Sequence, residues 1–319
     1  MRHLVTVADL SADEIWRLLD LATELKREWS AGGNEPVLAG KTLGMVFQKP
    51  SLRTRVSFEV GMLHLGGQAL YLSPQEIQLG QRESVTDVAR VLSRYVDAIM
   101  ARVFAHSDVE QLAARASVPV INGLSDYVHP CQALSDLFTI LENRGALRGL
   151  RLAFVGDGNN VAHSLLLAGS RVGMYVSVAT PGGYEPHEDV VRQAEAFAQQ
   201  SGGTVDVGTD ARAAVRGADV VYTDTWTSMG QEAERDRRVK DFGAFQVNTD
   251  LMALAGPDAV VMHCLPAHRG EEITDEVMDG PQSIVYEQAE NRMHLQKAIL
   301  VSLMVGQQSS LATGLPGGE

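Results

Sequence analysis

The sequence predicts an α/β fold made of two doubly wound domains. At 319 residues the chain is long for a single hydrophobic core, and 45% of its residues are apolar. Strand-like apolar runs alternate with helical patterns, which indicates parallel sheets flanked by helices. The alternation stops at Gly145 and Gly149 and then restarts. Two similar halves joined by a helix over 130–142 are therefore the simplest architecture.

Helical periodicity over 11–29 opens the first half, with Ser11 as the expected N-cap and Glu14 as its capping-box partner. Four strand-like runs and three helical patterns follow: strands 42–47, 68–72, 97–101 and 118–121, and helices 52–65, 84–94 and 108–115. A longer helix starts at Pro130, a residue that suits the first helical position. Its apolar stripe comprises Ala133, Leu134, Leu137, Ile140 and Leu141.

The second half repeats the alternation. Its expected strands are 151–155, 174–179, 204–207, 218–223, 258–262 and 283–286, and its expected helices are 161–171, 188–199, 210–215, 249–254 and 290–305. The Gly/Ser/Pro-rich tail after the last helix is expected to be disordered. Ligands in such sheets bind beyond the carboxyl ends of the strands, so polar residues just after each strand are the site candidates.

The composition excludes several classes of function. The formal net charge is −13 and no block of Lys or Arg occurs, so a nucleic-acid partner is not expected. Two cysteines, Cys131 and Cys264, make no disulfide framework. The N-terminus lacks the apolar core of a signal peptide, and no apolar run approaches membrane-spanning length. A soluble cytoplasmic protein with no membrane partner is the expectation.

The segment Ser51-Leu52-Arg53-Thr54-Arg55 precedes a helical pattern, and the free N–H groups and dipole of a helix N-terminus favour an anion. Arginine can clasp two phosphate oxygens, and the Ser51 and Thr54 hydroxyls can donate to them. The segment therefore predicts a local phosphate site. The alternative is an N-cap serine followed by solvated arginines. The helix itself places Val56, Val60 and Leu63 on one apolar face.

Gly156-Asp157-Gly158-Asn159-Asn160 follows a strand and matches part of a dinucleotide-binding fingerprint. Val161 occupies the place of the third glycine, and Thr180 at the end of the next strand is not acidic, so nicotinamide binding is disfavoured. A tight strand-to-helix turn is the structural alternative. Asn160 is still a candidate substrate ligand because its amide offers both a donor and an acceptor.

Other polar groups lie beyond strands or at helix starts. Arg102 follows the strand 97–101, and His129 and Gln132 lie at the start of the 130–142 helix, where His129 could equally be a cap. Asp224 follows the strand 218–223. It could anchor a substrate ammonium or form an Asx turn.

Cys264 in His263-Cys264-Leu265-Pro266 also follows a strand, and three interpretations are open: a buried small side chain, a nucleophile and a metal ligand. Zinc is disfavoured because no CxxC or HxxxH pair accompanies it. A cysteine beside a histidine is weak evidence for covalent catalysis. Gln288-Ala289-Glu290-Asn291-Arg292 adds a further cation at the start of the last helix.

Together these motifs resemble the transcarbamylase family, and within it the members that use ornithine. The likeness covers nearly the whole chain and rests on ordered motifs: 51–55, Ala101-Arg102-Val103, His129-Pro130-Cys131-Gln132, 156–160, Asp224-Thr225-Trp226-Thr227-Ser228-Met229-Gly230, 263–266 and 288–292. The resemblance implies transfer of the carbamoyl group of carbamoyl phosphate to the side-chain amine of L-ornithine. L-Citrulline and phosphate would form through a tetrahedral intermediate, with no metal and no organic cofactor.

The resemblance also assigns residues to the two substrates. Those for carbamoyl phosphate are Ser51, Leu52 (by its backbone), Arg53, Thr54, Gln78, Arg102, His129, Gln132, Cys264, Leu265 and Arg292. Those for ornithine are Asn160, Asp224, Ser228 and Met229, with Asp224 pairing with the α-ammonium. The implied catalytic residues are Arg102, His129 and Cys264. Arg102 and His129 would serve the carbamoyl oxygen as in an oxyanion hole, and Cys264 would line the site near the attacking amine.

The resemblance further implies a carbamoyl phosphate-binding domain, 1–134 completed by a helix at about 290–319, and an ornithine-binding domain, 135–289. Two interdomain helices would join them. A homotrimer, or a multiple of trimers, is implied, with Gln78 reaching into a neighbouring subunit's site. Leu52 stands where the family usually has threonine, which removes a hydroxyl but keeps the backbone N–H.

Two rival interpretations make different demands on the sequence. A relative that binds partners without catalysis would be expected to lose the arginines or Asp224, and this chain retains them. A dinucleotide oxidoreductase would need the glycine that Val161 replaces. Arginine biosynthesis is the expected pathway, although the motifs do not distinguish citrulline synthesis from the reverse reaction.

Overall fold

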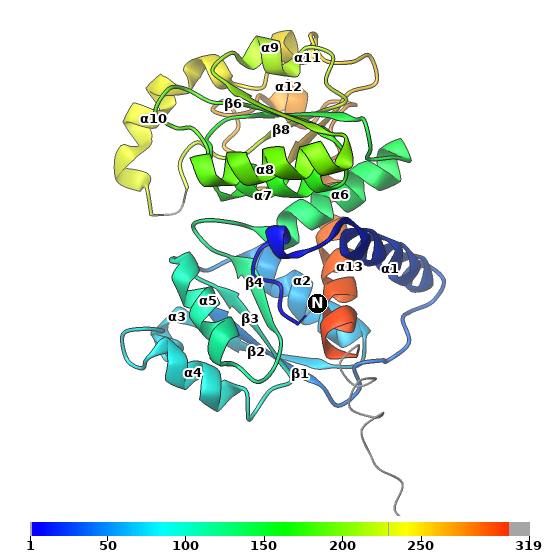
Figure 1. Ribbon diagram of the computed structural model, residues 1–319, viewed down its shortest axis with the longest axis vertical. Helices are drawn as coiled ribbons and strands as arrows, with labels where there is room; N and C mark the ends of the chain where they lie inside the picture. The colour runs from blue at the N-terminus through cyan, green and yellow to red at the C-terminus, as the bar shows by residue number, and fades with distance from the viewer. Residues whose placement is uncertain (1, 229, 306–319) are drawn as a thin grey trace, which may run out of the picture. The chain divides into compact units, whose positions relative to one another are not determined.

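The computed structural model describes residues 2–228 and 230–305, which fall into two compact units. The first unit comprises the chain up to Leu134 and the segment that begins at Arg292, and the second is Ser135–Asn291. The boundaries lie inside two long helices, α6 (Pro130–Arg144) and α13 (Val285–Met304) (Figure 1).

The described strands of the first unit form one parallel sheet in the order β2-β1-β3-β4. They are β1 (Thr42–Phe47), β2 (Gln68–Leu72), β3 (Ala98–Arg102) and β4 (Val120–Leu124). β1 and β3 are buried almost throughout, as expected for central parallel strands. The chain leaves β1 for β2 and leaves β3 for β4 on the other side. The topological switch point therefore lies at the carboxyl ends of β1 and β3.

The helices of the first unit begin where the sequence supplies caps. They are η1 (Val7–Asp9), α1 (Ala12–Ser30), α2 (Leu52–His64), α3 (Pro74–Ile77), α4 (Val85–Leu92) and α5 (His106–Arg115). The predicted capping box of α1 is present, since the Ser11 side chain accepts from the Glu14 N–H and the Glu14 carboxylate accepts from the Ser11 N–H. Side chains of α4 and α5 pack against β1, β3 and β4 in one apolar cluster.

Helix α2 does not bury the face that the sequence predicted. Val56 and Leu63 are 46% and 69% exposed, and the buried residues are Thr54, Phe58, Gly61 and Met62. The helix has apolar residues on two separate faces, so spacing alone did not select the inward one. An outward face with Leu52, Val56 and Leu63 follows.

The described strands of the second unit form a parallel sheet in the order β7-β6-β5-β8-β9. They are β5 (Arg151–Val155), β6 (Tyr175–Ala179), β7 (Thr204–Gly208), β8 (Val220–Thr223) and β9 (Val260–His263). Here the switch point lies at the carboxyl ends of β5 and β8.

Helices cover both faces of this second sheet. They are α7 (Asn160–Arg171), α8 (Glu188–Ser201), α9 (Ala211–Val215), α10 (Arg235–Asp241), α11 (Thr249–Met252) and α12 (Asp275–Met278), with short η2 (Glu232–Glu234) and η3 (Gly243–Phe245). Figure 1 shows α7 and α8 on one face and α9, α11 and α12 on the other. The described residues thus confirm the predicted class of two parallel sheets flanked by helices.

The predicted strand 283–286 is wrong. Ser283 makes a single bridge to Val261, and α13 already begins at Val285, five residues before the predicted helix start. A short apolar run such as Ile284-Val285 fits a strand or a buried helix equally well by pattern. Strand β4 lies at 120–124 rather than 118–121. The tail predicted to be disordered lies outside the described residues beyond position 305.

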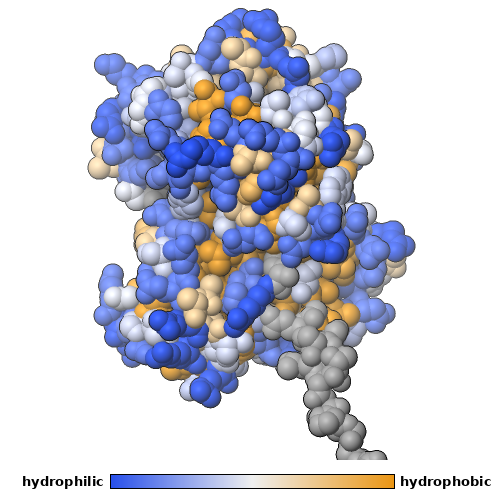
Figure 2. Space-filling view, in the orientation of Figure 1, coloured by the Kyte–Doolittle hydropathy of each residue, from blue (hydrophilic) through white to orange (hydrophobic). Residues whose placement is uncertain are grey.

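The face of the molecule in Figure 2 is mostly hydrophilic, in keeping with 40 acidic and 27 basic residues in the sequence. Among the described residues, no helix combines the length and the apolar character that a membrane crossing needs.

Candidate functional site

Several of the residues predicted to bind carbamoyl phosphate gather in the first unit around the N-terminus of α2, whereas Cys264 and Leu265 belong to the second unit. Ser51 is the N-cap of this helix, and its Oγ accepts a hydrogen bond from the Thr54 N–H (3.3 Å). The Ser51 hydroxyl also donates to Thr54 Oγ1 (3.1 Å). Ser51 is therefore an N-cap, as the alternative interpretation stated. This role does not exclude a phosphate site, because two arginines also lie at this helix start.

Two buried arginines from distant parts of the sequence meet at the Thr54 hydroxyl. Arg102, the last residue of β3, places Nη1 3.4 Å from Thr54 Oγ1, and Arg292 on α13 places Nη2 3.1 Å from the same atom. Thr54 itself is completely buried. One hydroxyl thus orients two guanidinium groups at a helix N-terminus, where backbone N–H groups already favour an anion.

His129 and Gln132 lie at the start of α6 in the same unit, and both are buried. Burial lowers the pKa of His129 well below its usual value, and the positive charges of Arg292 and Arg102 lower it further. The imidazole is accordingly neutral at neutral pH and can offer either one donor or one acceptor to a ligand. We call Ser51, Thr54, Arg102, His129, Gln132 and Arg292 the phosphate cluster.

Three predicted phosphate ligands lie at the edge of this cluster or away from it. Arg53 is half-buried on α2, and the side chain of Leu52 is 76% exposed, so the replacement of the usual threonine changes the surface of the helix. Gln78 is exposed on a surface loop with a positive φ of 40°, and its amide donates to the Gln75 carbonyl (3.3 Å). The structure does not bring Gln78 to the phosphate cluster of its own chain.

Cys131, which follows Pro130 in α6, is a structural residue. It is completely buried, and its thiol donates to the Asn122 carbonyl (3.4 Å). Burial raises the pKa of this thiol to about 12, so a thiolate does not form near neutral pH.

In the second unit, Asn160 and Asp224, which were predicted to bind ornithine, follow the carboxyl ends of β5 and β8, and Cys264 follows the carboxyl end of β9. Asp224, just after β8, is largely buried and accepts hydrogen bonds from the Thr225 N–H (2.8 Å) and from Asn159 Nδ2 (2.8 Å). The Cys264 thiol donates to Asp224 Oδ1 at 3.0 Å. We call Asn159, Asp224 and Cys264 the carboxylate cluster.

Asn159 is a functional candidate that the sequence reasoning missed. Its Oδ1 accepts from the N–H groups of Val161 and Ala162 and so caps α7, while its Nδ2 orients Asp224. The predicted ligand Asn160 is the first residue of α7 and is half-buried. An asparagine directly before a helix was the available signal for a cap, but the contact with Asp224 needs the fold.

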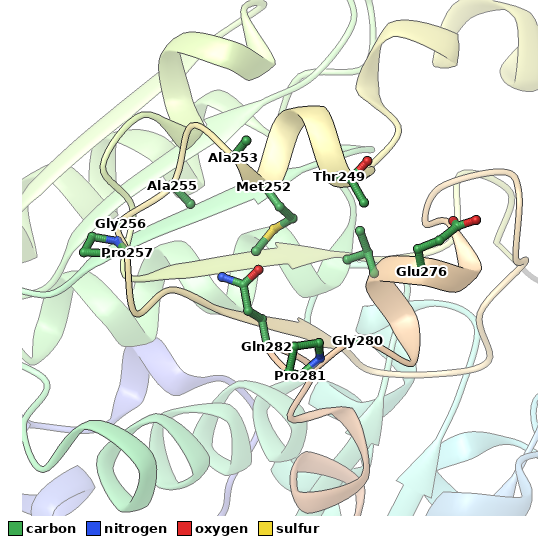
Figure 3. Close-up of a pocket in the computed structure, with 11 residues that line it drawn as sticks. Thr249, Met252, Ala253, Ala255, Gly256, Pro257, Glu276, Gly280, Pro281 and Gln282 are labelled. Carbon is green, nitrogen blue, oxygen red and sulfur yellow. The ribbon is translucent and has the colours of Figure 1, made fainter.

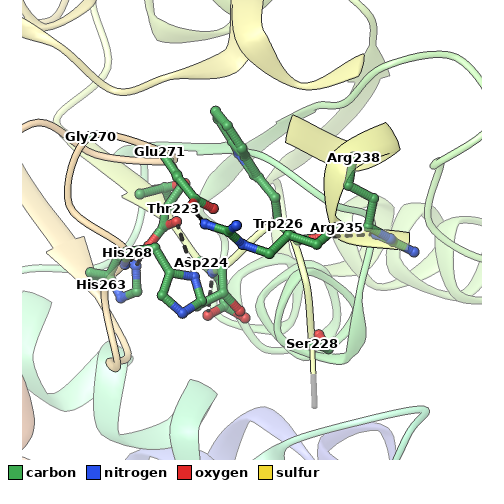
Figure 4. A network of polar contacts seen from close by, with 12 residues as sticks. Thr223, Asp224, Trp226, Ser228, Arg235, Arg238, His263, His268, Gly270 and Glu271 are labelled. Carbon is green, nitrogen blue, oxygen red and sulfur yellow. Dashed lines mark hydrogen bonds and ion pairs between the residues drawn. The ribbon is translucent and has the colours of Figure 1, made fainter. Parts of the chain in front are cut away.

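The loop after Asp224 is supported by one arginine. Arg238 Nη1 donates to the Trp226 carbonyl (3.0 Å) and pairs with Asp157 Oδ2 (2.9 Å), while its Nε pairs with Glu234. Arg235 pairs with Glu271 on the loop after β9 (Figure 4). Ser228 is half-buried and its N–H donates to Gln231 Oε1 (3.1 Å). Met229 lies outside the described residues.

Asp157 is an unusual carboxyl group within this support. Burial raises its pKa to about 6, although the neighbouring Arg238 charge acts in the opposite direction. A carboxyl group that is half-protonated near pH 6 therefore supports the loop that carries Asp224.

Asp224, His263 and Cys264 bring three possible metal-ligand atoms within 4.8 Å of one another. Both ring nitrogens of His263 are already engaged, Nδ1 by the Leu265 N–H and Nε2 by Glu272, and the Cys264 thiol is engaged by Asp224. This hydrogen bonding does not fit a metal-binding site.

A groove of about 410 Å³ lies elsewhere in the second unit, at the amino ends of β8 and β9 (Figure 3). It is lined by Thr249, Met252, Ala253, Ala255, Gly256, Pro257, Glu276, Val277, Gly280, Pro281 and Gln282. Asp224 and Cys264 follow the carboxyl ends of the same strands, so this groove is separate from the carboxylate cluster.

Both units are similar to known protein families and to known proteins. Residues 2–142 match the carbamoyl-P binding domain of aspartate/ornithine carbamoyltransferase, and residues 148–303 match its Asp/Orn binding domain. The chain is 58% identical over 305 residues to an anabolic ornithine carbamoyltransferase of Pyrococcus furiosus, covering 96% of this chain and 97% of that protein. It is 56% identical over 303 residues to the ornithine carbamoyltransferase of Anoxybacillus flavithermus, with coverage of 95% and 96%.

Solved structures are similar over the same extent. An ornithine carbamoyltransferase from Pyrococcus furiosus superposes with a TM-score of 0.94 at 58% identity, covering 96% of this chain and 97% of that chain. An anabolic ornithine carbamoyltransferase from Campylobacter jejuni superposes with a TM-score of 0.91 at 40% identity, covering 96% and 100%.

Proposed function

Because the chain belongs to the aspartate/ornithine carbamoyltransferase family, we propose that it transfers the carbamoyl group of carbamoyl phosphate to the side-chain amine of L-ornithine. The products are L-citrulline and phosphate. The observation that carries the proposal is the convergence of Arg102 and Arg292 on the Thr54 hydroxyl at the N-terminus of α2. This arrangement suits a dianionic leaving group in a protein whose net charge is −13.

On the first unit, the phosphate cluster binds carbamoyl phosphate. Arg53, Arg102 and Arg292 neutralise the charge that grows on the leaving phosphate, and the backbone N–H groups at Leu52 and Arg53 add fixed donors. The neutral His129 imidazole and the Arg102 guanidinium serve the carbamoyl oxygen. Gln132, buried in the first turn of α6, supplies an amide for the carbamoyl group.

On the second unit, the carboxylate cluster and the 224–230 loop bind ornithine. Asp224 pairs with the α-ammonium, and Asn160, Ser228 and Met229 complete the set assigned to the amino acid. The amine must lose a proton before it attacks the carbamoyl carbon. A tetrahedral intermediate then collapses with departure of phosphate. Cys264 and Leu265 are assigned to the carbamoyl group and the attacking amine, without covalent catalysis.

The acceptor decides the name of the activity, and the loops at 224–230 and 263–266 favour ornithine. Asp224 supplies a carboxylate for an ammonium group, whereas an aspartate acceptor would need an additional cation for its second carboxylate. The relatives compared above are named ornithine carbamoyltransferases, which supports the same choice.

We also propose a homotrimer, or a multiple of it, in which Gln78 serves the neighbouring subunit. Leu52, Val56 and Leu63 on α2 and Leu70 on the edge strand β2 are 76%, 46%, 69% and 48% exposed, which is an unusual concentration of apolar surface. The exposed position of Gln78, with no contact to its own phosphate cluster, supports a role across a subunit boundary.

Location and pathway are part of the same proposal. A cytoplasmic enzyme is favoured by two free thiols, Cys131 and Cys264. Arginine biosynthesis is favoured because two of the compared relatives carry the description anabolic.

The deciding experiment supplies purified protein with carbamoyl phosphate and one amine at a time: ornithine, N-acetylornithine, putrescine or aspartate. We expect citrulline from ornithine and no product from the other three. Turnover with a different amine alone would overturn the acceptor but leave the phosphate cluster in place. No turnover with any amine would replace the proposal with a binding role for the chain.

A further inference from the structure

His263 ends β9 directly before Cys264, and the two binding sets assigned above do not include it. Its side chain and that of Glu272 are both completely buried. Three hydrogen bonds hold this residue. Its backbone N–H donates to Gln288 Oε1, its Nδ1 meets the Leu265 N–H, and its Nε2 meets Glu272 Oε1, each at 2.9 Å.

These partners leave one protonation pattern for the imidazole. The Leu265 N–H can only donate, so His263 Nδ1 must accept and carries no proton. The ring proton therefore lies on Nε2, from which it donates to Glu272, while Glu272 Oε1 also accepts from the His268 N–H (2.6 Å). A doubly protonated ring would set two N–H donors against each other at Leu265.

The residue held by this ring has a backbone conformation that needs support. Leu265 has a φ of 58°, in the left-handed region that residues with a Cβ rarely adopt. Cys264 lies between His263 and Leu265, and its thiol reaches Asp224 Oδ1 at 3.0 Å. The imidazole thus holds the backbone that follows the cysteine in contact with Asp224, while Gln288 holds the backbone that precedes it.

The other end of the support is also rigid. Gln288, whose Oε1 accepts from the His263 N–H, donates from Nε2 to Asp136 (2.8 Å) and to the Tyr222 hydroxyl (3.0 Å). The Tyr222 hydroxyl in turn donates to Asp136 (3.0 Å). This buried network of α6, β8 and α13 side chains gives Gln288, from the 288–292 motif, a structural role.

We propose that His263, as the Nε2-protonated tautomer set by Glu272 and Leu265, is a positioning residue that holds Cys264 and Leu265 in register with Asp224. The kinetic part of this inference rests on the proposed function, whereas the tautomer does not. His263 touches neither substrate in this account and acts through the backbone of Leu265.

Two substitutions separate the functions of the two ring nitrogens. In His263→Asn the amide oxygen occupies roughly the place of Nδ1 and can still accept from the Leu265 N–H. In His263→Gln the amide occupies roughly the place of Nε2 and can donate to Glu272, but the Leu265 N–H loses its acceptor. His268→Gln is the matched control, because the His268 side chain is 44% exposed and lies 3.8 Å from Glu272 Oε2, not on the Oε1 that His263 contacts, and its backbone N–H remains on Glu272.

We expect His263→Gln to lower kcat/KM for ornithine about 100-fold, the order of loss that misplaced reacting groups cause. His263→Asn should lose no more than about 10-fold. His268→Gln should change kcat/KM for ornithine by no more than about two-fold. The affinity of every variant for inorganic phosphate, measured by calorimetry, should also stay within about two-fold of the wild type. Equal losses in His263→Asn and His263→Gln, or full activity in both, would overturn the positioning role.

Nitrogen-15 spectra of the wild-type enzyme with labelled histidine test the tautomer separately. We expect one buried histidine with a protonated Nε2 and a bare Nδ1, a signal that His263→Gln removes. A protonated Nδ1 would overturn the assignment even in an active enzyme. If the wild type makes no citrulline, the proposed function fails, and the spectra still decide the tautomer.

Discussion

Thr54 is a neutral residue on which two buried cations depend. Its hydroxyl meets Arg102 and Arg292 and also the N-cap Ser51, so it joins the helix start to β3 and α13. Since the residue is completely buried, its contribution is to orientation rather than to surface charge. Removal of this one oxygen therefore alters the orientation of the two arginines while both remain present.

Thr54→Val replaces the hydroxyl with a methyl group of similar size. We expect carbamoyl phosphate to bind about 10- to 100-fold more weakly, because hydrogen bonds to charged groups contribute about 1.5–3 kcal/mol. Thr54→Ser keeps the oxygen and should bind within a few-fold of the wild type. Calorimetric titration with carbamoyl phosphate or inorganic phosphate measures both, and equal affinity of the two variants would contradict this role.

Arg53 and Arg55 form a matched pair on α2. Arg55 is exposed, pairs with Glu59 and lies over the Tyr71 ring, whereas Arg53 is free of these contacts and half-buried. We expect Arg53→Ala to raise KM for carbamoyl phosphate at least about 10-fold with a smaller effect on ornithine, because its charge serves phosphate. Arg55→Ala should change neither by more than about two-fold. Equal losses for both substrates in Arg53→Ala would refute the assignment.

Asp157 makes stability depend on pH in a direction opposite to that of most carboxyl groups. Its pKa in the fold is about 6, above the ordinary value of 3.8, so the folded protein binds this proton more tightly than the unfolded chain. Stability then falls as pH rises between these two values and levels off above about 6. The stability that protonated Asp157 contributes is therefore lost as the pH is raised, not as it is lowered.

Asp157→Asn removes this titration. From pH 5 to pH 7 we expect the wild type to lose about 1.3 kcal/mol of unfolding free energy relative to the variant, since one pKa unit corresponds to about 1.4 kcal/mol. Denaturant unfolding of both proteins at the two pH values measures the difference. A difference that does not vary with pH, or that varies in the opposite sense, would show that Asp157 titrates normally.

At the scale of elements, the cap of α7 also serves the carboxylate cluster. Asn159 accepts from two N–H groups of the helix with Oδ1 and donates to Asp224 with Nδ2. Serine retains the first function and loses the second, whereas alanine loses both. The two substitutions therefore separate helix stability from the orientation of Asp224.

We expect Asn159→Ser and Asn159→Ala to raise KM for ornithine to a similar extent, because both leave Asp224 without its amide donor. Only Asn159→Ala should also lower the unfolding free energy, by about 1 kcal/mol. Steady-state kinetics and thermal unfolding measure the two effects. A normal KM in Asn159→Ser would mean that Thr225 and Cys264 suffice to hold Asp224.

The sequence predicted an element well where its apolar pattern covers many residues, and poorly where the element is short. α1 and α6 were predicted closely because their patterns extend over many residues, and the central strands because each is a continuous apolar run. The four-residue helices α3 and α12 and the seven-residue α10 were missed, since so few residues show no period. Val285 was assigned to a strand for the same reason, and the inward face of α2 was wrong because the helix has two separate apolar faces.

The candidate site divides in the same way. Ser51, Arg102, Asp224 and Cys264 could be predicted because each lies at a helix start or a strand end. The contact of Thr54 with Arg292 joins positions 238 residues apart, and no local pattern indicates it. The dependence of Cys264 on Glu272, through His263, likewise appears only in the folded chain.

At the scale of the whole molecule, the exposed apolar residues of α2 and β2 test the assembly. Leu63→Glu places a charge on this surface, and we expect the trimer to dissociate because burial of an unpaired carboxylate is costly. Tyr286→Glu, on an exposed position of α13, is the matched control and should leave assembly intact. Light scattering after gel filtration gives the mass in each case. A trimeric Leu63→Glu would place the subunit interface elsewhere.

If Gln78 serves a neighbour, the dissociated Leu63→Glu protein should also lose activity although its own phosphate cluster is unchanged. Mixing Gln78→Ala subunits with Arg292→Ala subunits checks this directly. Hybrid trimers should recover part of the activity, since some sites then contain a normal Gln78 and a normal Arg292. No recovery would refute the shared arrangement.

The first unit is assembled from both ends of the chain, and this sets an order for its completion during synthesis. All of the second unit, from Ser135 to Asn291, leaves the ribosome before Arg292 does. At about 5–20 residues per second, Thr54 and Arg102 wait roughly 8 to 30 s after Leu134 for their partner. A ligand that needs Arg292 therefore cannot engage its complete site while the first unit alone is being made, and it can do so only after the whole second unit has been synthesised.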